Sequence, residues 1–260
     1  ARAGKAVDRS PVRVRTRATA PPSRPARPTA ASTGVPQRLK DDLRIVRRDL
    51  VVTRPGTTLR RLDVRGFIDV RAPNVTIEDS VVRGGVATYN RGLITNYGFR
   101  GLVVRRVDLR PSNRSVYVDG LKGWDFVARR VHVRGTVDSI KIHGDRVGVY
   151  DSLLGRTSYF ASDPSQGGGE THNDNIQVLR GTGIRLINNR ITKSQNFALL
   201  IAAEQGAVRA RVERNYLDGG HCTVKLGVGN HASRVELVRN RFGPNRDVEG
   251  CLFVSTPGVD

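Results

Sequence analysis

Short runs in which apolar and polar residues alternate recur along the chain from Leu43 onward, separated by Gly, Pro and Asn. One family of runs has a strand-turn-strand pattern, and its members are NVTIEDSVV, GLVVRRVDL, DFVARRVHV, VGVYDSLLG, IRLINNRIT, ARVERNYLD and VELVRNRFG. A second family lies between them and alternates with period two, as in SVYVDG, SIKIHG, NIQVLRG, ALLIAAEQG, TVKLGVG and CLFVSTPG. Alternation bounded by turn formers is typical of half-buried strands. The pattern therefore predicts a repeat built from short strands.

The length of the repeat selects among the repeat architectures. Aligning Ile77, Val103, Val127, Val149, Leu186, Val212 and Leu237 gives spacings of 26, 24, 22, 37, 26 and 25 residues. A propeller blade needs four strands in about 40 residues. A leucine-rich repeat needs a helical or turn segment of Leu/Ala pattern in each unit, and none is present. We therefore predict an all-β fold, a right-handed parallel β-helix (a solenoid) with about three short strands per coil.

Two sets of side chains support stacking of the coils. Asn189, Asn215 and Asn240 fall at equivalent places in three repeats, as expected for an Asn ladder in a corner. Cys222 and Cys251 are 29 residues apart, close to one coil, so they are predicted to lie on adjacent rungs within disulfide reach. Two buried free thiols are the alternative for these cysteines.

The first 36 residues differ from the rest of the chain. They consist mainly of Ala, Arg, Pro, Ser and Thr, hold six of the 12 prolines and show no apolar periodicity. Such a segment buries too little apolar surface to offset its ordering entropy. Residues 1–36 are therefore predicted to be a disordered linker, and residues 37–260 the parallel β-helix domain.

Composition gives expectations about location and partners. No run of 18 apolar residues exists, so no membrane span is expected. The chain begins at Ala1 and contains no Met, and a disulfide implies an oxidising compartment, so we expect a mature, secreted, extracellular protein. The net charge of +20 favours an acidic polymer as partner. Nucleic acid is disfavoured because few aromatic residues accompany the basic ones. A monomer is expected.

Polar residues of the second strand family are predicted to gather on one outward face. With Ile140, Ile176, Leu199 and Val224 inward, the residues that follow them point outward, namely Lys141, Gln177, Leu200 and Lys225. Asp138 and Asp174 stand two residues before the first two inward positions. Because neighbouring rungs are about 4.8 Å apart, Asp138, Lys141, Asp174 and Gln177 should lie close together.

The single long interval adds a loop beside this face. Its extra residues fall in TSYFASDPSQGGGETHND, positions 157–174, and insertions in a solenoid leave it as loops. Gly167, Gly168 and Gly169 are expected to make the loop mobile. The loop carries Tyr159 and His172 toward the polar face.

The region from about 44 to 257 resembles the pectin-lyase-like superfamily of right-handed β-helices. Segments such as APNVTIEDS and THNDNIQV are similar to those of secreted β-helix-repeat proteins of high-GC bacteria. The resemblance implies a carbohydrate-active context, because lyases, hydrolases and epimerases that act on polyuronates share this architecture. It is a resemblance of repeats and carries no catalytic signature of its own.

The chemistry that fits the polar face is β-elimination on an acidic, uronate-containing polysaccharide. In the superfamily a bound Ca²⁺ or another cation often neutralises the substrate carboxylate, and Lys or Arg removes the proton. The expected catalytic residues are Lys141, as base, and His172, as acid or base. Calcium is the expected cofactor, with Asp138 and Asp174 as its ligands. Residues expected to hold the substrate are His143, Arg156, Gln177, Lys225 and Tyr159.

Two other functions stay open from the sequence. A glycoside hydrolase on the same fold would use the two carboxylates directly as acid and base. A non-catalytic polysaccharide-binding or adhesion protein would leave the same side chains as a solvated surface. Among the enzymes, a lyase is favoured over a hydrolase.

Overall fold

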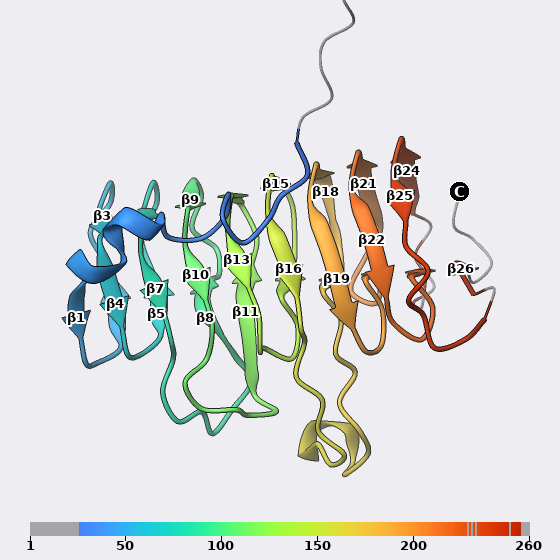
Figure 1. Ribbon diagram of the computed structural model, residues 1–260, viewed down its shortest axis with the longest axis horizontal. Helices are drawn as coiled ribbons and strands as arrows, with labels where there is room; N and C mark the ends of the chain where they lie inside the picture. Colours follow the sequence, from blue (N-terminus) through green and yellow to red (C-terminus); the bar gives the residue numbers. More distant parts are fainter. Residues whose placement is uncertain (1–25, 228, 230, 232, 250, 256–260) are drawn as a thin grey trace, which may run out of the picture.

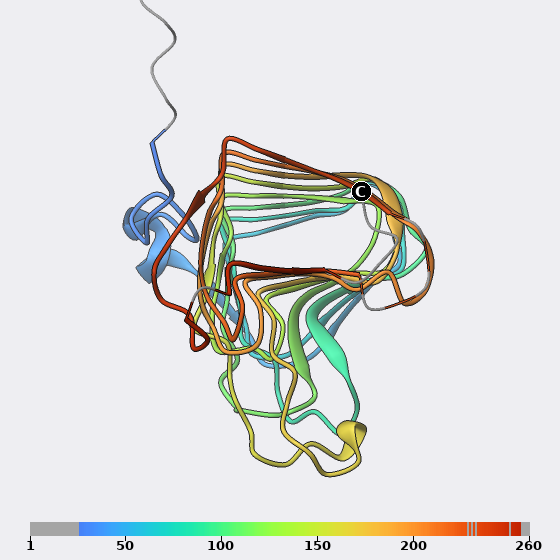
Figure 2. The same ribbon diagram turned by 90° about the vertical axis from the view of Figure 1, so that its right-hand side faces the viewer.

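The computed structural model describes residues 26–227, 229, 231, 233–249 and 251–255, and their regular secondary structure is almost entirely β-strand (Figure 1). The strands form three sheets in which every pair of neighbours is parallel, and successive strands of the chain belong to successive sheets. Figure 2 looks along the stack and shows the three sheets around a common interior. The predicted parallel β-helix is confirmed.

The three sheets are called A, B and C here. Sheet A has nine strands, which are β1 (Arg44–Val46), β4 (Leu62–Val64), β7 (Val81–Val82), β10 (Asp108–Leu109), β13 (His132–Val133), β16 (Leu153–Gly155), β19 (Arg190–Ser194), β22 (Tyr216–Gly219) and β25 (Arg241–Phe242). Sheet B also has nine, which are β2 (Leu50–Val52), β5 (Ile68–Val70), β8 (Arg91–Asn96), β11 (Val118–Gly123), β14 (Ile140–Ile142), β17 (Ile176–Val178), β20 (Leu199–Ile201), β23 (Val224–Leu226) and β26 (Phe253–Ser255). Sheet C has eight, which are β3 (Thr58–Arg60), β6 (Thr76–Glu78), β9 (Leu102–Arg105), β12 (Phe126–Arg129), β15 (Val147–Tyr150), β18 (Gly181–Ile187), β21 (Val208–Glu213) and β24 (Arg234–Val238).

Inward side chains of all three sheets form one continuous apolar core. Val64, Ile94, Val104, Ile140 and Leu186 are among its fully buried members. The predicted inward positions of sheet B, including Ile140, pair with one another in adjacent strands as expected.

Two positions of the repeat alignment are wrong by one residue. In sheet C, Ile77 pairs with Val104, and Ala128 pairs with Val149, so Val103 and Val127 point outward. Val127 is 36% exposed, whereas Val104 and Ala128 are fully buried. The error arises because each segment has two adjacent apolar residues, so alternation alone does not say which one faces the core.

The predicted Asn ladder is present at the corner between sheets C and A. Asn215 Oδ1 accepts hydrogen bonds from the main-chain N–H and the side-chain amide of Asn189 at 2.8 and 3.0 Å. Asn240 Oδ1 accepts the equivalent pair from Asn215 at 2.9 and 3.1 Å. The ladder satisfies main-chain groups that the turn would otherwise leave buried without partners.

The predicted disulfide joins Cys222 and Cys251, whose Cα atoms are 4.9 Å apart. It ties the chain before β23 to the chain before β26, so it fastens the last coil to its neighbour. Disulfides are typical of proteins in oxidising compartments. None of the helices in the described part of the chain is long and apolar enough to cross a membrane.

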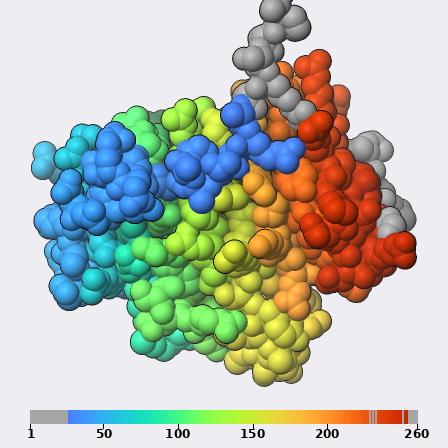
Figure 3. Space-filling model, in the orientation of Figure 1, coloured from blue at the N-terminus to red at the C-terminus, as the bar shows by residue number. Residues whose placement is uncertain are grey.

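The N-terminal segment differs from the expectation. Residues 1–25 of the predicted linker lie outside the described residues, but residues 26–36 run across the outside of the β-helix (Figures 1 and 3). Gly34 donates its N–H to Arg130 O at 2.8 Å, and Val35 donates to Asp108 Oδ2 at 2.9 Å. The 3₁₀ helix η1 (Gln37–Asp42) follows, and its Leu39 packs with Val35 and Val81. The packed chain therefore starts before the predicted boundary at residue 37.

Candidate functional site

The longest loops leave the stack at the corner between sheets A and B. The connections 83–90, 110–117, 134–139 and 156–175 lie there, and Figures 1 and 2 show the longest of them projecting on the same side. They lead directly into β8, β11, β14 and β17. The outer face of these four strands of sheet B is therefore the part of the solenoid that the loops border.

Three successive strands of this face carry the same spacing of polar residues. An Asp precedes a Lys or Gln by three positions in Asp119–Lys122, Asp138–Lys141 and Asp174–Gln177. Lys122 pairs with Lys141 between β11 and β14, and Lys141 pairs with Gln177 between β14 and β17. The sequence-based prediction that Lys141 and Gln177 are neighbours, with Asp138 and Asp174 beside them, agrees with this register.

The three aspartates form a ladder that is fully buried. Asp119 Oδ1 accepts the main-chain N–H of Asp138 at 3.2 Å, and Asp138 Oδ1 accepts that of Asp174 at 2.9 Å. Asp174 Oδ1 accepts the main-chain N–H of Phe197 at 2.9 Å and the amide of Asn196 at 3.0 Å. Each carboxylate thus links its own coil to the next one, and we call this set the aspartate ladder.

Two lysines neutralise two of the three carboxylates. Lys141 Nζ lies 2.8 Å from Asp138 Oδ2, and Lys122 Nζ lies 3.3 Å from Asp119 Oδ2 and also bonds to Asn90 Oδ1. On the third rung Gln177 replaces the lysine, so Asp174 Oδ2 is buried without a hydrogen-bond partner. Burial, and next the charge of Asp138, raise the pKa of Asp174 well above its ordinary value. Asp174 accordingly keeps its proton to a higher pH than an ordinary aspartate does.

The two lysines have pKa values shifted in opposite directions. Burial would lower the pKa of Lys141, but the carboxylates of Asp138 and Asp119 outweigh it and raise that pKa. Burial lowers the pKa of Lys122, and the Lys141 ammonium lowers it further, although Asp119 opposes the shift. Burial also raises the pKa of Asp138, against the attraction of Lys141. At neutral pH Lys141 is therefore a fixed cation, while Lys122 loses its proton more easily than an ordinary lysine.

An aromatic row lies beside the lysines at the ends of the same strands. The Tyr97 ring makes edge-to-face contacts with Trp124 at 5.4 Å and with His143 at 5.6 Å between ring centroids. Burial, and next the charges of Lys122 and Lys141, lower the pKa of His143 to about 4, so its imidazole is neutral at pH 7. Burial and Asp119 raise the pKa of Tyr97 to about 12, so its hydroxyl keeps its proton. Tyr97 is 42% exposed and can meet a ligand.

A hollow of about 270 Å³ adjoins this row. Its lining includes Tyr89, Asn90, Arg91, Thr95 and Tyr97. Tyr89 is 58% exposed, and Asn90 connects the hollow to Lys122. Around Lys141, Gln177 Oε1 and His143 Nε2 are buried atoms without hydrogen-bond partners among the described residues. The face therefore combines cations, exposed rings and unpaired polar atoms, which is the composition of a site for a polar ligand.

The other residues expected in the site lie at various distances from this cluster. Lys225 belongs to the same outward row as Lys141, three rungs away, and its Nζ lies 5.4 Å from the centroid of the Phe197 ring. Arg156 is exposed at the end of sheet A with a φ of 55°, so it turns the corner and is not on sheet B. His172 is exposed on the long loop and makes no hydrogen bond or ion pair with another described residue.

The long loop is held by more contacts than its glycines suggest. Asn173 Nδ2 donates to Thr157 Oγ1 at 2.8 Å across its base, and Phe160 and Thr171 are hydrogen-bonded along its length. It also contains a short 3₁₀ helix, η2 (Pro164–Gln166), capped by Asp163. A hydrogen bond with Glu170 raises the pKa of Tyr159, so Tyr159 is engaged within the loop. Mobility of the loop stays a prediction, although Gly167 and Gly168 donate their main-chain N–H groups to Pro164 O at 3.3 Å and Asp163 O at 3.0 Å.

The aspartates fit a calcium ion poorly as they are arranged. Calcium takes six to eight oxygen ligands, but the Oδ1 atoms of Asp138 and Asp174 already accept main-chain N–H groups. The Lys141 ammonium occupies Asp138 Oδ2. Across the residues that the structure describes, no group of three or more His, Cys, Asp or Glu side chains is arranged to hold a metal ion. Dependence on calcium stays a prediction.

Sequence reasoning missed Lys122, Tyr97 and Trp124. Lys122 could have been found from the sequence, because the Asp-x-x-Lys spacing of VDSIK also occurs in VDGLK. Lys122 lies two residues after the end of the segment SVYVDG, which was aligned without it. Tyr97 and Trp124 follow strands that had not been aligned with the others.

Comparisons with known proteins add no assignment. The chain matches no protein-family model, and neither the curated proteins nor the solved structures contain a match. The fold by itself fits carbohydrate-active proteins in general, so function must be argued from the site.

Proposed function

We propose that this protein is a secreted polysaccharide lyase that cleaves an acidic, uronate-containing polymer by β-elimination. The observation that carries the proposal is the pair Lys122 and Lys141, which lie on adjacent rungs and have pKa values moved apart. Paired titratable groups whose environments separate their pKa values are typical of an acid–base site. Secretion is supported by the disulfide.

Lys141 is assigned the neutralising role. Elimination removes the proton at C5 of the uronate, and this proton becomes acidic only when the charge of the adjacent carboxylate is offset. A permanently charged ammonium, held by the buried Asp138, offers that compensation without a metal. We therefore assign Lys141 as the cation and not as the base that the sequence suggested, because a raised pKa keeps it protonated at neutral pH and leaves no free electron pair to accept a proton.

Lys122 is assigned the role of the base and Tyr97 that of the acid. The neutral amine of Lys122 takes the C5 proton, the electron pair forms the C4–C5 double bond, and the C4–O glycosidic bond breaks. The Tyr97 hydroxyl gives its proton to the departing oxygen. The products are a chain with an unsaturated end and a chain with a new hydroxyl end, and exchange with water restores both side chains.

Neighbouring residues are assigned to substrate binding. The exposed rings of Tyr89 and Tyr97 offer apolar faces to sugar rings, and the buried, unpaired carbonyl of Gln177 offers a polar contact. Lys225 lies farther along the same row and is suited to a second uronate carboxylate. His143 supports the Tyr97 ring. On the loop side, Arg156, Tyr159 and His172 are the candidate contacts, and His172 keeps its proposed catalytic part as a proton carrier.

A glycoside hydrolase is less well supported because of burial. A hydrolase needs one carboxyl at the glycosidic oxygen and another at the sugar ring or its attacking water. Asp119, Asp138 and Asp174 are fully buried and bound to main-chain N–H groups. The binding or adhesion alternative draws on the same exposed rings and cations, and only turnover separates it from a lyase.

The test is incubation of the protein with a panel of uronate polymers while ultraviolet absorbance and reducing ends are followed together. A lyase increases both the absorbance and the number of reducing ends, and a hydrolase increases only the number of reducing ends. A non-catalytic binding protein increases neither, but it migrates more slowly in a gel that contains the polymer. Running each assay with a chelator and with added calcium tests the calcium prediction. We expect Lys122→Met and Lys141→Met to lose the absorbance change. If Lys122→Met keeps full activity, a residue other than Lys122 is the base.

A further inference from the structure

Four arginines form a row on the outer face of sheet A, away from the proposed lyase site. They follow the last residues of consecutive strands and are Arg65, Arg83, Arg110 and Arg134. Main-chain bonds fix the alignment, because Arg110 N–H donates to Val82 O and Arg134 N–H donates to Leu109 O. Neighbouring guanidinium groups therefore leave the sheet from rungs about 4.8 Å apart.

The four arginines share only two carboxylates on this face. Asp63 pairs with Arg83 and lies 3.7 Å from Arg65. Asp108 lies 3.7 Å from Arg134, but it also accepts the N–H of Val35 and contacts His132 at 3.4 Å. Asp63 is thus committed to Arg83 and Arg65, and Asp108 to Arg134, His132 and the N–H of Val35.

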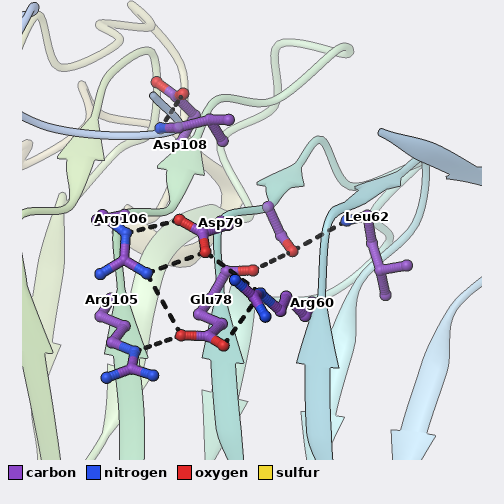
Figure 4. A network of polar contacts seen from close by, with 9 residues as sticks. Arg60, Leu62, Glu78, Asp79, Arg105, Arg106 and Asp108 are labelled. Carbon is purple, nitrogen blue, oxygen red and sulfur yellow. Dashed lines mark hydrogen bonds and ion pairs between the residues drawn. The ribbon is translucent and has the colours of Figure 1, made fainter. Parts of the chain in front are cut away.

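Arg110 in the middle of the row has no such partner. Its guanidinium makes no hydrogen bond or ion pair with any described residue, and its Nε is buried. Burial, and next the charges of Arg83 and Arg134, lower the pKa of Arg110, against the weaker pull of Asp108 and Asp63. Figure 4 shows the contrast on sheet C, where Arg105 and Arg106 bond to Glu78 and Asp79. Arg110 is only partly buried, but its Nε has no acceptor among the described residues, and a small anion in front of it would supply one.

A hollow of about 420 Å³ lies in front of Arg110. Arg83 and Arg134 line it from the sheet together with Asp63 and Asp108, whose charges are offset by ion pairs. Lys40 and Asp41 line it from the N-terminal segment that crosses the sheet. The hollow is therefore bounded by two parts of the chain that are far apart in sequence. Its size accommodates a small ion or a pendant group but not a whole polymer strand.

We propose that this hollow binds a tetrahedral oxyanion of the sulfate or phosphate class, held mainly by Arg110 with Arg83 and Arg134 on either side. A guanidinium presents N–H donors in a planar fork that matches two oxygens of such an anion. Guanidinium groups on consecutive rungs bring further donors to the remaining oxygens. The source is either the free ion or a sulfate or phosphate group carried by a saccharide chain. The proposal does not depend on lyase activity, because the site lies on a different face.

The test is titration calorimetry of the full chain with sodium sulfate and sodium phosphate, at constant ionic strength set with sodium chloride. We expect a single saturable site, and we expect Arg110→Gln to weaken binding by about 10- to 100-fold, as for loss of a charged hydrogen bond. Arg110→Lys keeps the charge and loses the fork, so it should bind with intermediate affinity. Arg185→Gln is the matched control, because Arg185 is an exposed, unpaired arginine on sheet C, and it should bind as the wild type does.

The outcomes separate the sources and can overturn the proposal. Binding of inorganic sulfate or phosphate identifies the free ion as sufficient. Binding of dextran sulfate alone, if lost in Arg110→Gln, identifies a pendant group as the ligand. No saturable binding of any of the three by the wild type, or equal weakening in Arg110→Gln and Arg185→Gln, refutes a built site.

Discussion

Replacing Lys141 by Met tests whether the aspartate ladder depends on its cations. Met has nearly the length of Lys without the charge, so the substitution removes the 2.8 Å ion pair with Asp138 and keeps most of the packing. Asp138 is fully buried, while the Lys141 side chain is 19% exposed. The lysine is therefore only partly exposed, with its ammonium held on a buried carboxylate. Its loss should affect stability as well as turnover.

The size of the effect follows from burial. Removing one partner of a buried ion pair costs about 3–5 kcal/mol. Asp138 keeps the N–H of Asp174 as a donor, and the pair is open to solvent on the lysine side. We therefore expect Lys141→Met to lower the free energy of unfolding by about 2–4 kcal/mol at pH 7. The double variant Asp138→Asn/Lys141→Met, which buries no charge, should lie within about 1 kcal/mol of the wild type.

The stability loss in Lys141→Met should depend on pH, and the pKa of Asp138 determines in which direction. Without Lys141, the pKa of Asp138 in the folded protein rises further above its unfolded value, because burial is no longer opposed by a cation. A carboxyl with a raised folded pKa contributes stability at low pH that is lost as the pH rises through that pKa. The loss in Lys141→Met should therefore be small near pH 4, about the ordinary pKa of Asp, and should grow toward pH 8.

The assay is urea unfolding followed by circular dichroism at several pH values. Lys225→Met is the control, because Lys225 lies on the same outward row but rests on the Phe197 ring instead of a carboxylate. It should show no growth of the loss with pH. If Lys141→Met unfolds like the wild type at pH 8, or if the double variant is no more stable than Lys141→Met, then Asp138 does not depend on Lys141 and the reasoning fails.

Three further predictions follow from the same structure. Lys122→Met should lower the rate of elimination by about 10²–10⁴-fold, the usual contribution of a general base, while polymer binding is kept. In the wild type the rate should rise with pH as Lys122 loses its proton. A rate that falls with pH contradicts the assignment of Lys122 as the base. Asp174→Asn should gain stability relative to the wild type as the pH rises from 4 to 8, because it removes a carboxyl whose pKa is raised; a parallel pH profile of the two proteins contradicts this. Asn215→Ala should lose about 3–5 kcal/mol, since its side chain makes four hydrogen bonds in a buried corner, and a loss below 1 kcal/mol in urea unfolding argues against the ladder.

The sequence predicted the fold because the repeat is redundant. The seven strand-turn-strand segments and the three equivalent Asn residues give coil lengths of 22 to 26 residues apart from one insertion, so an error in one segment does not change the architecture. The error at Val103 and Val127 shows the limit, because a pair of adjacent apolar residues leaves the inward one undecided. Sheet B was predicted more accurately, since in segments such as SIKIHG a charged residue separates the two apolar ones.

The site was predicted only in part because its chemistry depends on burial. The neighbourhood of Asp138, Lys141 and Asp174 followed from period-two alternation alone. The opposite pKa shifts of Lys122 and Lys141 did not, because they arise from how deeply each ammonium lies and from which carboxylates surround it. No spacing rule in the sequence contains that information. The aspartates were likewise identified as a cluster, but not as a hydrogen-bonded ladder that ties one coil to the next.

The position of the site follows from which corner of the coil can change length. At the corner between sheets C and A every described connection has one or two residues, and Asn and Ser side chains bond to the main chain there. Inserting residues at that corner would break the ladder. At the corner between sheets A and B the connections vary from three residues (47–49) to 20 (156–175), because the strands on either side keep their register whatever the loop does. Loops can therefore be added over the outer face of sheet B without disturbing the stack, and the lysines and exposed tyrosines lie on that same face. A solenoid of this kind separates the corner that maintains the fold from the corner that can acquire a function.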